Sequence, residues 1–352
     1  MNVAAHRIQV NDSRFDEWLR ALEPDVVIFD RFMIEEQFGW RVETACPNAL
    51  RVLDTQDLHC LREARHQQLK KGGDLDLFNE SALREIASIH RSDLTLMISQ
   101  FEMQLLNDEF KIPAAQLAYW PFLLDRIQSS VPSFEARRHF IMIGSFHHAP
   151  NLDAARWCKQ AIWPLIRERL PDAELHLYGS YGEKYAGELN DPKSGFYFKG
   201  RAEDALETMQ DYRVNLAPLR FGAGLKGKLF DGFETGTPSV TTPVGIEGVV
   251  GEGLEWGCAV SDDPEVIAQT AVALYRDQSL WQKVVSQGRL IAEKRFARST
   301  WEERLPTVLS DSIESLDGNR KAHFVGRMLR HHHHRSTEYM SRWIEAKNVK
   351  RI

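Results

Sequence analysis

Short apolar runs alternate with longer amphipathic stretches over the first third of the chain. The runs are residues 25–30 (DVVIFD), 49–54 (ALRVLD) and 94–99 (LTLMIS), and they are rich in aliphatic and β-branched residues. Helical stretches, including 79–91 (NESALREIASIHR), separate them, and QLAYWPF follows. Continuous apolar runs of this length are typical of parallel strands that are buried on both faces. The pattern therefore predicts an α/β domain.

A second alternation follows a polar, proline-bearing segment, residues 125–139, which is the best candidate for a linker. Its predicted strands are HFIMIGS, AELHLYGS, FYFKGR, VNLAPLR and PSVTTP. Its predicted helices are APNLDAARWCKQAIWPLIRERL with Asn151 as N-cap, one from Glu203, one over about 225–235, DPEVIAQTAVALYRD and LWQKVVSQGRLIAEKRF. The order predicts an α/β fold of two Rossmann-like, doubly wound domains with the active site in the cleft between them.

Length and composition agree with this organisation. A chain of 352 residues is too long for one ordinary core and fits two domains of roughly 150 residues each. We predict an N-terminal domain over residues 1–130, a C-terminal domain over 138–308 and a basic helical tail over 309–352. The contents of 43% hydrophobic and 27% charged residues are those of an ordinary soluble globular protein.

The cysteines and the N-terminus indicate a cytoplasmic protein. The chain starts MNVAAHRIQVNDSRFDEW, without the apolar segment of a signal peptide, and no apolar run approaches the roughly 20 residues that a bilayer requires. The cysteines are far apart and form no CxxC pair, which favours a reducing compartment and argues against structural zinc. They are Cys46, Cys60, Cys158 and Cys258.

Charge is distributed unevenly along the chain. Residues 319–352 hold nine Lys or Arg against two Asp or Glu, a net charge of +7, which leaves −13 for the remainder because the whole chain carries −6. Such a tail could attract an anionic membrane, so peripheral contact with the inner membrane face is an expectation, whereas no nucleic-acid partner is expected. The alternative is a solvated helix that packs through its apolar side chains, Phe324, Met328, Leu329, Tyr339 and Trp343.

The segment FGAGLKGKLFDGFETGTPSVTTPVGIEG, residues 221–248, fits two phosphate-binding patterns in part. Gly222, Gly224 and Gly227 spell the dinucleotide fingerprint G-x-G-x-x-G, while Gly222, Gly227 and Lys228 spell the start of a P-loop. Leu229 replaces the Ser or Thr that would bind magnesium in a P-loop. The fingerprint normally follows the first strand of its domain, but here it follows a later one.

Two lysines distinguish this loop from both patterns. Lys226 in the loop and Lys228 in the first turn of the next helix can converge on one diphosphate, together with the free N–H groups of that turn. Asp231 lies three residues later, where its carboxylate can accept hydrogen bonds from ribose hydroxyls. A site for a nucleoside diphosphate without a dedicated metal ion explains these residues best. A glycine-rich turn with solvated lysines is the alternative.

Residues 140 to about 308 resemble the C-terminal, donor-binding domain of GT-B glycosyltransferases, specifically the retaining family 4 (glycosyl transferases group 1). The resemblance rests on FIMIGSFHHAPNLDA, ELHLYGS, FKGR and VNLAPLRFGAGLKGKLFDGFETGTPSVTTPVGIEGV, in this order and spacing. It continues more weakly through VVIFDRFMIEEQFGWRV and LRVLDTQDLHCLREAR, so that it covers about 25–308.

The resemblance implies a glycosyltransferase that moves a sugar from a nucleotide-diphosphate donor to an acceptor hydroxyl with retention, without a metal ion or a further cofactor. The acceptor would be a glycan, a lipid or a protein. Lys226 and Lys228 would act in catalysis because they stabilise the leaving diphosphate. The implied donor-binding residues are Gly144, Ser145, Gly222, Gly224, Lys226, Lys228, Asp231 and Glu247, the last of which would accept hydrogen bonds from the donor sugar.

Two residues depart from the family pattern in this loop. Asp231 is one methylene shorter than the Glu that usually binds the ribose, and Ala223 stands where the pattern E-x7-E has its first carboxylate. The N-terminal part departs further, because family members open with a strand, a glycine-rich turn and a helix. We therefore expect the N-terminal domain to lack its first βα unit, either because the start codon is assigned too late or because the protein is a shortened relative.

His59 is the third catalytic candidate. Together with Asp57 and Arg62, it follows the carboxyl end of the strand 49–54, where open α/β sheets bind ligands. His59 could orient the acceptor or the donor sugar. A capping Asp and a surface His at a helix start are the alternative reading. Weaker candidates with a similar placement are Arg31, His147 and His148.

Two other functions fit the same fold class. A non-catalytic GT-B-like binding protein is favoured by the shortened first domain and by Asp231 and Ala223. A sugar-nucleotide epimerase shares the two-domain fold, but the loop with its two lysines fits the transferase pattern better. The D-x-D sequence at residues 74–76 matches a metal motif of the other glycosyltransferase fold, but it lies in a charged stretch and is interpreted as solvated surface.

Overall fold

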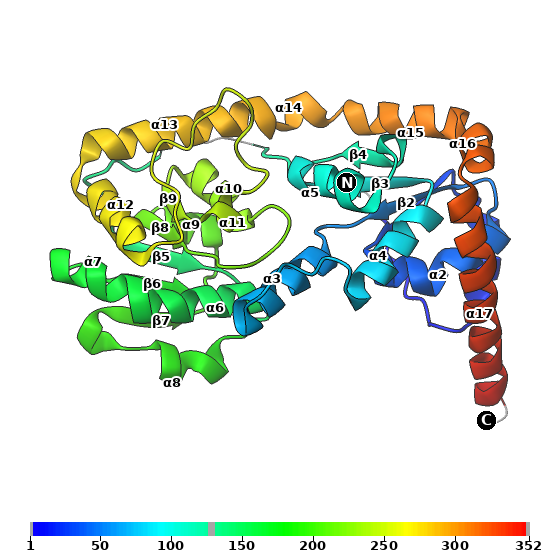
Figure 1. Cartoon of the computed structure of the whole chain (residues 1–352), viewed down its shortest axis with the longest axis horizontal. Helices are drawn as coiled ribbons and strands as arrows, with labels where there is room; N and C mark the ends of the chain where they lie inside the picture. The colour runs from blue at the N-terminus through cyan, green and yellow to red at the C-terminus, as the bar shows by residue number, and fades with distance from the viewer. Residues whose placement is uncertain (1–2, 126–130, 350–352) are drawn as a thin grey trace. The chain divides into compact units, whose positions relative to one another are not determined.

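The computed structural model describes residues 3–125 and 131–349, which divide into two compact units (Figure 1). Unit 1 comprises residues 1–60, 76–120 and 303–352, and unit 2 comprises residues 61–75 and 121–302. The predicted linker, 125–139, belongs to unit 2, and its residues 126–130 lie outside the described residues. The units differ from the predicted domains, since 61–75 and the segment that starts at 121 belong to unit 2, whereas 303–308 and the tail belong to unit 1.

Unit 1 is built on a four-stranded parallel sheet in the order β1-β2-β3-β4. The three apolar runs and QLAYWPF supply its strands, which are β1 (Val26–Asp30), β2 (Leu50–Asp54), β3 (Leu94–Met97) and β4 (Leu117–Tyr119). The helices that begin in this unit are α1 (Arg14–Leu22), α2 (Phe32–Ala45), α3 (His59–Lys71), α4 (Glu80–Arg91), α5 (Gln100–Phe110), α15 (Arg304–Glu314), α16 (Leu316–Ala322) and α17 (Phe324–Val349).

The last helices of the chain complete the core of this first sheet. Alternating residues of β2 and β3 pack against Leu316 of α16 and against Leu305, Val308 and Leu309 at α15. The burial of these aliphatic side chains stabilises the packing of α15 and α16 against β2 and β3. The tail is therefore part of unit 1 and covers its sheet.

The helix α17 packs against α2 and α4 through polar rather than apolar side chains. Its buried side chains are Arg330, His334 and Ser341, whereas Phe324, Met328, Tyr339 and Trp343 are exposed. The prediction that apolar side chains pack the tail onto the protein is thus wrong for these four residues, whereas the fifth, Leu329, is half-buried. Ion pairs supply the contact instead, because Arg330 lies 3.2 Å from Glu43 and His334 is hydrogen-bonded to the same carboxylate.

A buried ion pair joins α2 and α4 beneath this helix. The Nε of Arg91 donates to both carboxylate oxygens of Glu35 at 3.0 Å, and both side chains are at most 3% exposed. Burial alone would raise the pKa of Glu35, but the imidazole of His334, 3.7 Å away, and the guanidinium of Arg91 hold that pKa below its usual value. Within the described residues, no helix is both long and apolar enough to cross a bilayer.

Unit 2 contains a five-stranded parallel sheet in the order β7-β6-β5-β8-β9. Its strands match the five predicted ones and are β5 (Arg138–Ile143), β6 (Leu175–Tyr178), β7 (Phe196–Gly200), β8 (Tyr212–Ala217) and β9 (Ser239–Thr241). Its helices are α6 (Ala149–Trp157), α7 (Trp163–Arg169), α8 (Ala186–Leu189), α9 (Ala205–Met209), α10 (Gly227–Thr235), α11 (Pro243–Ile246), α12 (Pro264–Arg276), α13 (Gln278–Arg295) and α14 (Arg298–Trp301).

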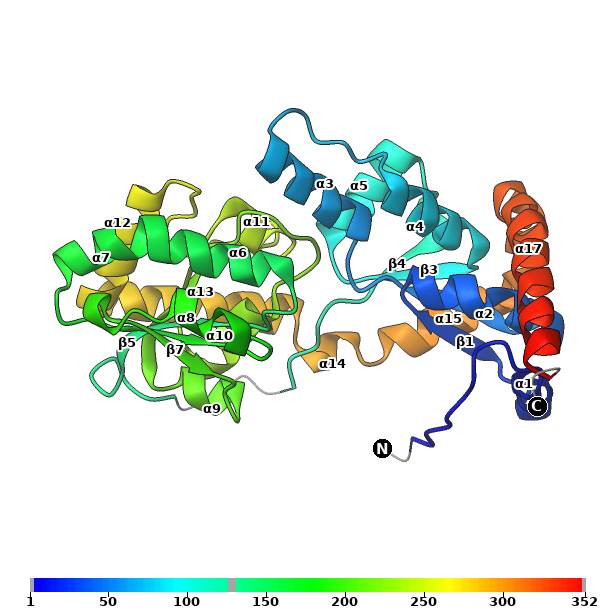
Figure 2. The ribbon, with the colours of Figure 1, turned by 90° about the horizontal axis from the view of Figure 1, so that it is seen from below.

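Helices cover both faces of this sheet (Figure 2). Phe140 and Met142 of β5 pack with residues of α6, α7 and α12, whereas Ile141 points to the other face and packs with Met209 of α9. This alternation confirms the doubly wound arrangement for unit 2. The predicted N-cap of α6 is wrong, because the helix begins at Ala149 with His148 as N-cap, and Asn151 lies inside its first turn.

We predict that Glu35→Ala lowers the free energy of unfolding by about 3–5 kcal/mol, because it leaves the buried Arg91 guanidinium without its carboxylate. Urea unfolding would measure the change. The control is Arg342→Ala, which breaks an exposed i,i+4 pair with Glu338 and should cost less than about 1 kcal/mol. Equal effects of the two substitutions would contradict this account of α2, α4 and α17.

Candidate functional site

The strand order of unit 2 places a switch point between β5 and β8. From β5 the chain proceeds outward through β6 and β7, then returns to the other side of β5 with β8 and continues to β9. The connections at the carboxyl ends of β5 and β8 therefore diverge, which is where open α/β sheets bind ligands. Gly144 and Ser145 follow β5, and the loop 218–226 follows β8 and leads into α10.

Asn151 and Lys228 link these two strand ends. The Nδ2 of Asn151 donates to the carbonyl of Ser145 at 2.8 Å, and its Oδ1 accepts from Lys228 Nζ at 2.7 Å. A Cβ atom on Gly144 would lie 2.8 Å from Asn151 Nδ2 and 3.1 Å from Lys228 Nζ. Glycine at position 144 thus leaves room for the polar ends of both side chains. The structure brings Gly144, Ser145 and Lys228 together as predicted.

The loop before α10 places a second ammonium group nearby. Gly224 adopts a φ of 62°, a left-handed conformation that glycine takes without strain. Lys226 occupies the N-cap position of α10, is only 7% exposed, and donates from Nζ to the carbonyl of Gly224 at 2.6 Å. Both lysines therefore lie at the N-terminus of α10, which is the positive end of the helix dipole.

Burial shifts the pKa values of the ionisable groups of α10, among them Lys228 and Asp231. Removal of the ammonium group from water lowers the pKa of Lys228 to about 8; the charge of Asp231 opposes this shift and the charge of Lys226 adds to it. Burial, with a contribution from Glu234, raises the pKa of Asp231 to about 6. Asp231 follows Lys228 by three residues, so both lie on one side of the helix. A bound anion would return Lys228 to its fully charged state.

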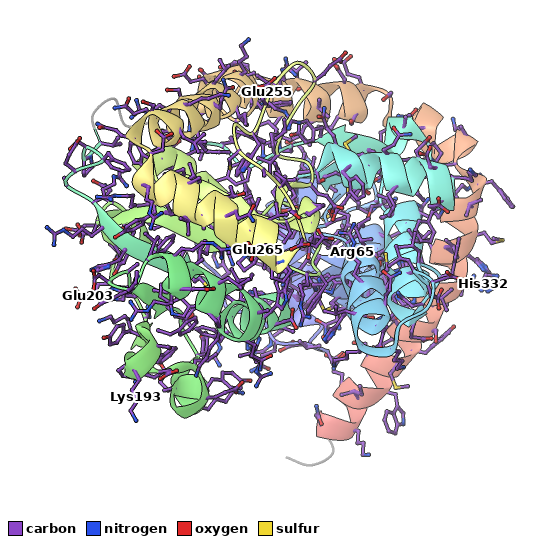
Figure 3. The ribbon with its side chains drawn as sticks, turned by 60° about the vertical axis from the view of Figure 1, so that its left-hand side comes forward. Arg65, Lys193, Glu203, Glu255, Glu265 and His332 are labelled. Carbon is purple, nitrogen blue, oxygen red and sulfur yellow. The ribbon has the colours of Figure 1, made fainter. Side chains whose placement is uncertain are left out.

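Glu247 forms an ion pair that the sequence did not predict. It follows α11, and its carboxylate accepts two hydrogen bonds from Arg65, at 2.6 and 2.7 Å. The same guanidinium donates to the carbonyl of Gly222 at 2.9 Å. Arg65 lies in the part of α3 that belongs to unit 2, and Figure 3 labels it. It therefore fixes the position of Glu247 relative to the glycine-rich loop.

Further contacts hold this loop against α6 and α3. Arg220 donates to both carboxylate oxygens of Asp153 in α6, at 2.5 and 2.9 Å. Phe221 stacks on His66 with ring centroids 4.3 Å apart and planes 7° from parallel. Both contacts involve residues directly before Gly222, so the start of the loop is held between α6 and α3.

His59 lies at the start of α3, within the segment assigned to unit 1. Its backbone N–H donates to Glu85 Oε1 at 2.8 Å, and its ring packs edge-on against Phe32 with centroids 5.3 Å apart. The Nε2 of His59 is 3.7 Å from Asp57. Burial raises the pKa of Glu85 to about 7. These contacts explain why α3 begins here, and the predicted role of His59 in orienting a sugar stays a prediction.

The weaker candidate residues named from the sequence contact their own neighbours in the fold. His148 is the N-cap of α6, His147 packs near Tyr181, and Arg31 forms an exposed pair with Asp30. Both acidic residues of the D-x-D sequence are exposed, in agreement with the reading as solvated surface. In the ranges 3–125 and 131–349, no three His, Cys, Asp or Glu side chains are grouped so that they could hold a metal ion.

The chain was compared with protein families, curated proteins and solved structures. Residues 137–277, which include the whole loop and both lysines, match the family model described as "Glycosyl transferases group 1". No curated protein matches the chain. Solved structures match it in fold at low sequence identity.

Three of these structures contain UDP, according to their descriptions. A mutant of TarM from S. aureus, in complex with Fondaparinux, alpha-GlcNAc-glycerol and UDP, has a TM-score of 0.66 at 12% identity, over 84% of this chain and 58% of that one. The pneumococcal O-GlcNAc transferase GtfA, in complex with UDP and GlcNAc, has a TM-score of 0.64 at 16% identity, over 85% and 60%. HepE from Anabaena, in complex with UDP and glucose, has a TM-score of 0.63 at 14% identity, over 85% and 80%.

The chain therefore spans 58% and 60% of the TarM and GtfA chains that it matches. At these identities the likeness establishes the fold. The predicted α/β class with parallel sheets is confirmed: the chain has the GT-B fold of these structures, and its residues 137–277 match the family model of glycosyl transferases group 1.

Proposed function

We propose that this protein transfers a sugar from a nucleoside-diphosphate donor to an acceptor hydroxyl, with retention and without a bound metal ion. The observation that carries the proposal is the pair of lysines at the start of α10, inside the segment that matches the family model. The descriptions of TarM, GtfA and HepE name UDP, so UDP-sugars are the first donors to test.

The diphosphate would bind at the divergence of β5 and β8. The ammonium groups of Lys226 and Lys228 and the first N–H groups of α10 would contact its oxygens, and Gly144 and Gly222 leave the backbone close to the ligand. Asp231, one turn into the helix, would accept hydrogen bonds from the ribose. When the glycosidic bond breaks, negative charge grows on the diphosphate, and two preorganised cations stabilise it without the cost of reorganising water.

The sugar would lie toward Glu247. This carboxylate already accepts two hydrogen bonds from Arg65, so its remaining lone pairs are available to sugar hydroxyls. Arg65 would then act as a positioning residue that holds the carboxylate toward the loop. His59 stays the candidate for orienting the acceptor or the donor sugar. Retention would follow if the acceptor hydroxyl attacks from the face that the diphosphate leaves, with the diphosphate taking the proton.

Titration calorimetry with UDP-, GDP- and ADP-sugars tests the donor site. The double variant Lys226→Ala/Lys228→Ala should bind about a hundredfold more weakly than wild type, because two charge-assisted contacts together contribute about 3 kcal/mol. The matched control is Lys193→Ala/Lys283→Ala, which removes two exposed lysines of unit 2 and should bind like wild type. Wild-type protein that binds none of these nucleotides would overturn the proposal.

The affinity for the nucleotide should depend on pH in a defined direction. The pKa of Lys228 is lowered to about 8, so raising the pH from 7 to 9 removes the proton from most of the free protein. If only the protonated form binds, the apparent Kd rises by about tenfold. Lys228→Arg should abolish this rise, because arginine keeps its charge. An affinity of wild type that does not change between pH 7 and 9 would contradict the assigned role of Lys228.

Transfer itself needs a separate assay. With the nucleotide sugar selected by calorimetry and a panel of glycan, lipid and peptide acceptors, we expect a product that keeps the anomeric configuration of the donor, as read from the anomeric proton coupling. We expect the same rate in EDTA and in Mg²⁺. Binding without transfer to any acceptor would favour the non-catalytic alternative, and an inverted product or a rate lost in EDTA would refute retention or metal independence respectively.

A further inference from the structure

The helix α17 of unit 1 has its polar and apolar faces reversed relative to an ordinary surface helix. The positions that it buries are Gly326, Arg330, His334 and Ser341. The apolar side chains that it exposes are Phe324 (68% exposed), Val325 (43%), Met328 (45%), Tyr339 (70%), Met340 (59%) and Trp343 (59%). Aromatic side chains at this exposure leave a large apolar area in water, which is unfavourable unless another surface covers it.

Met328, Tyr339 and Trp343 lie in one stripe along the helix, together with the exposed His332 and Arg335. Met328, His332, Arg335, Tyr339 and Trp343 follow one another at intervals of four, three, four and four residues, so they lie on one side of an α-helix. The buried positions are separated by four, four and seven residues and lie on the opposite side. Figure 3 labels His332, which projects outward from α17. The stripe therefore faces away from α2 and α4.

Basic side chains accompany this stripe. Arg327, Arg335, Arg342 and Lys347 are all exposed, and the ammonium group of Lys347 lies 4.8 Å from the centre of the Trp343 ring. The two acidic residues of the helix are engaged within the protein's own structure. Glu338 pairs with Arg342 at 2.5 Å, and Glu345 accepts hydrogen bonds from the N–H and hydroxyl of Ser13 at 2.9 and 2.7 Å.

We propose that α17 docks parallel to an anionic membrane surface, with the aromatic stripe at the level of the lipid headgroups and the basic side chains on the lipid phosphates. An apolar face with Trp and Tyr that is accompanied by Arg and Lys is what an interfacial helix requires. An anionic bilayer complements both properties at once. A second copy docked symmetrically through the same stripe would bring the basic residues of two helices together, which is unfavourable.

Flotation of the full chain with vesicles tests the proposal. Wild type should bind vesicles of phosphatidylcholine with 25% phosphatidylglycerol and should bind pure phosphatidylcholine vesicles at least tenfold more weakly. Met328→Ser/Tyr339→Ser/Trp343→Ser should lose binding at least tenfold while keeping the thermal stability of wild type, because these side chains are exposed. Each of Arg335→Gln and Lys347→Gln should weaken binding about fivefold.

Matched substitutions of other exposed side chains serve as the control. Leu22→Ser/Leu83→Ser/Tyr181→Ser removes apolar residues with exposures of 55%, 67% and 68% elsewhere on the chain and should bind vesicles like wild type. Wild type that binds neither vesicle, or a stripe variant that binds like wild type, would overturn the proposal. So would light scattering that shows a dimer in wild type and a monomer in the stripe variant without any vesicle binding, since a second copy would then cover the stripe.

Discussion

Two lysine ammonium groups lie near the carboxyl ends of β5 and β8, where they are partly removed from water. Burial of Lys228 and the positive charge of Lys226 together lower the pKa of Lys228 to about 8, so the protein holds this cation at a cost in free energy. The amide oxygen of Asn151 accepts one hydrogen bond from Lys228 but supplies no negative charge, and the carboxylate of Asp231 offsets only part of the shift in the pKa of Lys228. An anion bound at the start of α10 would offset that cost, which is why the geometry favours a diphosphate.

The rest of unit 2 keeps these groups in place. The strand order separates the connections after β5 and β8, Gly144 leaves room for the ends of Asn151 and Lys228, and Gly224 lets the loop turn into α10. Ion pairs with α3 and α6 also hold the glycine-rich loop in position. The guanidinium of Arg65 joins Glu247 to the Gly222 carbonyl, and Arg220 joins the loop to α6 through Asp153. The site is therefore preorganised by backbone and side chains together.

The elements and the glycine-lysine loop could be predicted because their signals are local. Continuous apolar runs specify buried parallel strands, and glycines with lysines at short spacing specify an anion-binding turn. Long-range pairings carry no such signal. Arg65 and Glu247 are 182 residues apart, and Asn151 resembled a helix cap until the structure showed its amide between Ser145 and Lys228. The buried face of α17 was predicted wrongly for a related reason. Ion pairs with Glu43 and Glu35, which are distant in sequence, decide which side of the helix is buried, although its apolar residues suggested the other side.

Proton uptake on nucleotide binding tests the central claim most directly. At pH 8 a lysine with a pKa of about 8 is half protonated, and a bound diphosphate should complete its protonation. Calorimetry of UDP binding in buffers with different ionisation enthalpies should therefore show an uptake of about half a proton per site in wild type and none in Lys228→Arg. Binding of UDP by wild type without proton uptake would show that Lys228 does not compensate the charge of the diphosphate.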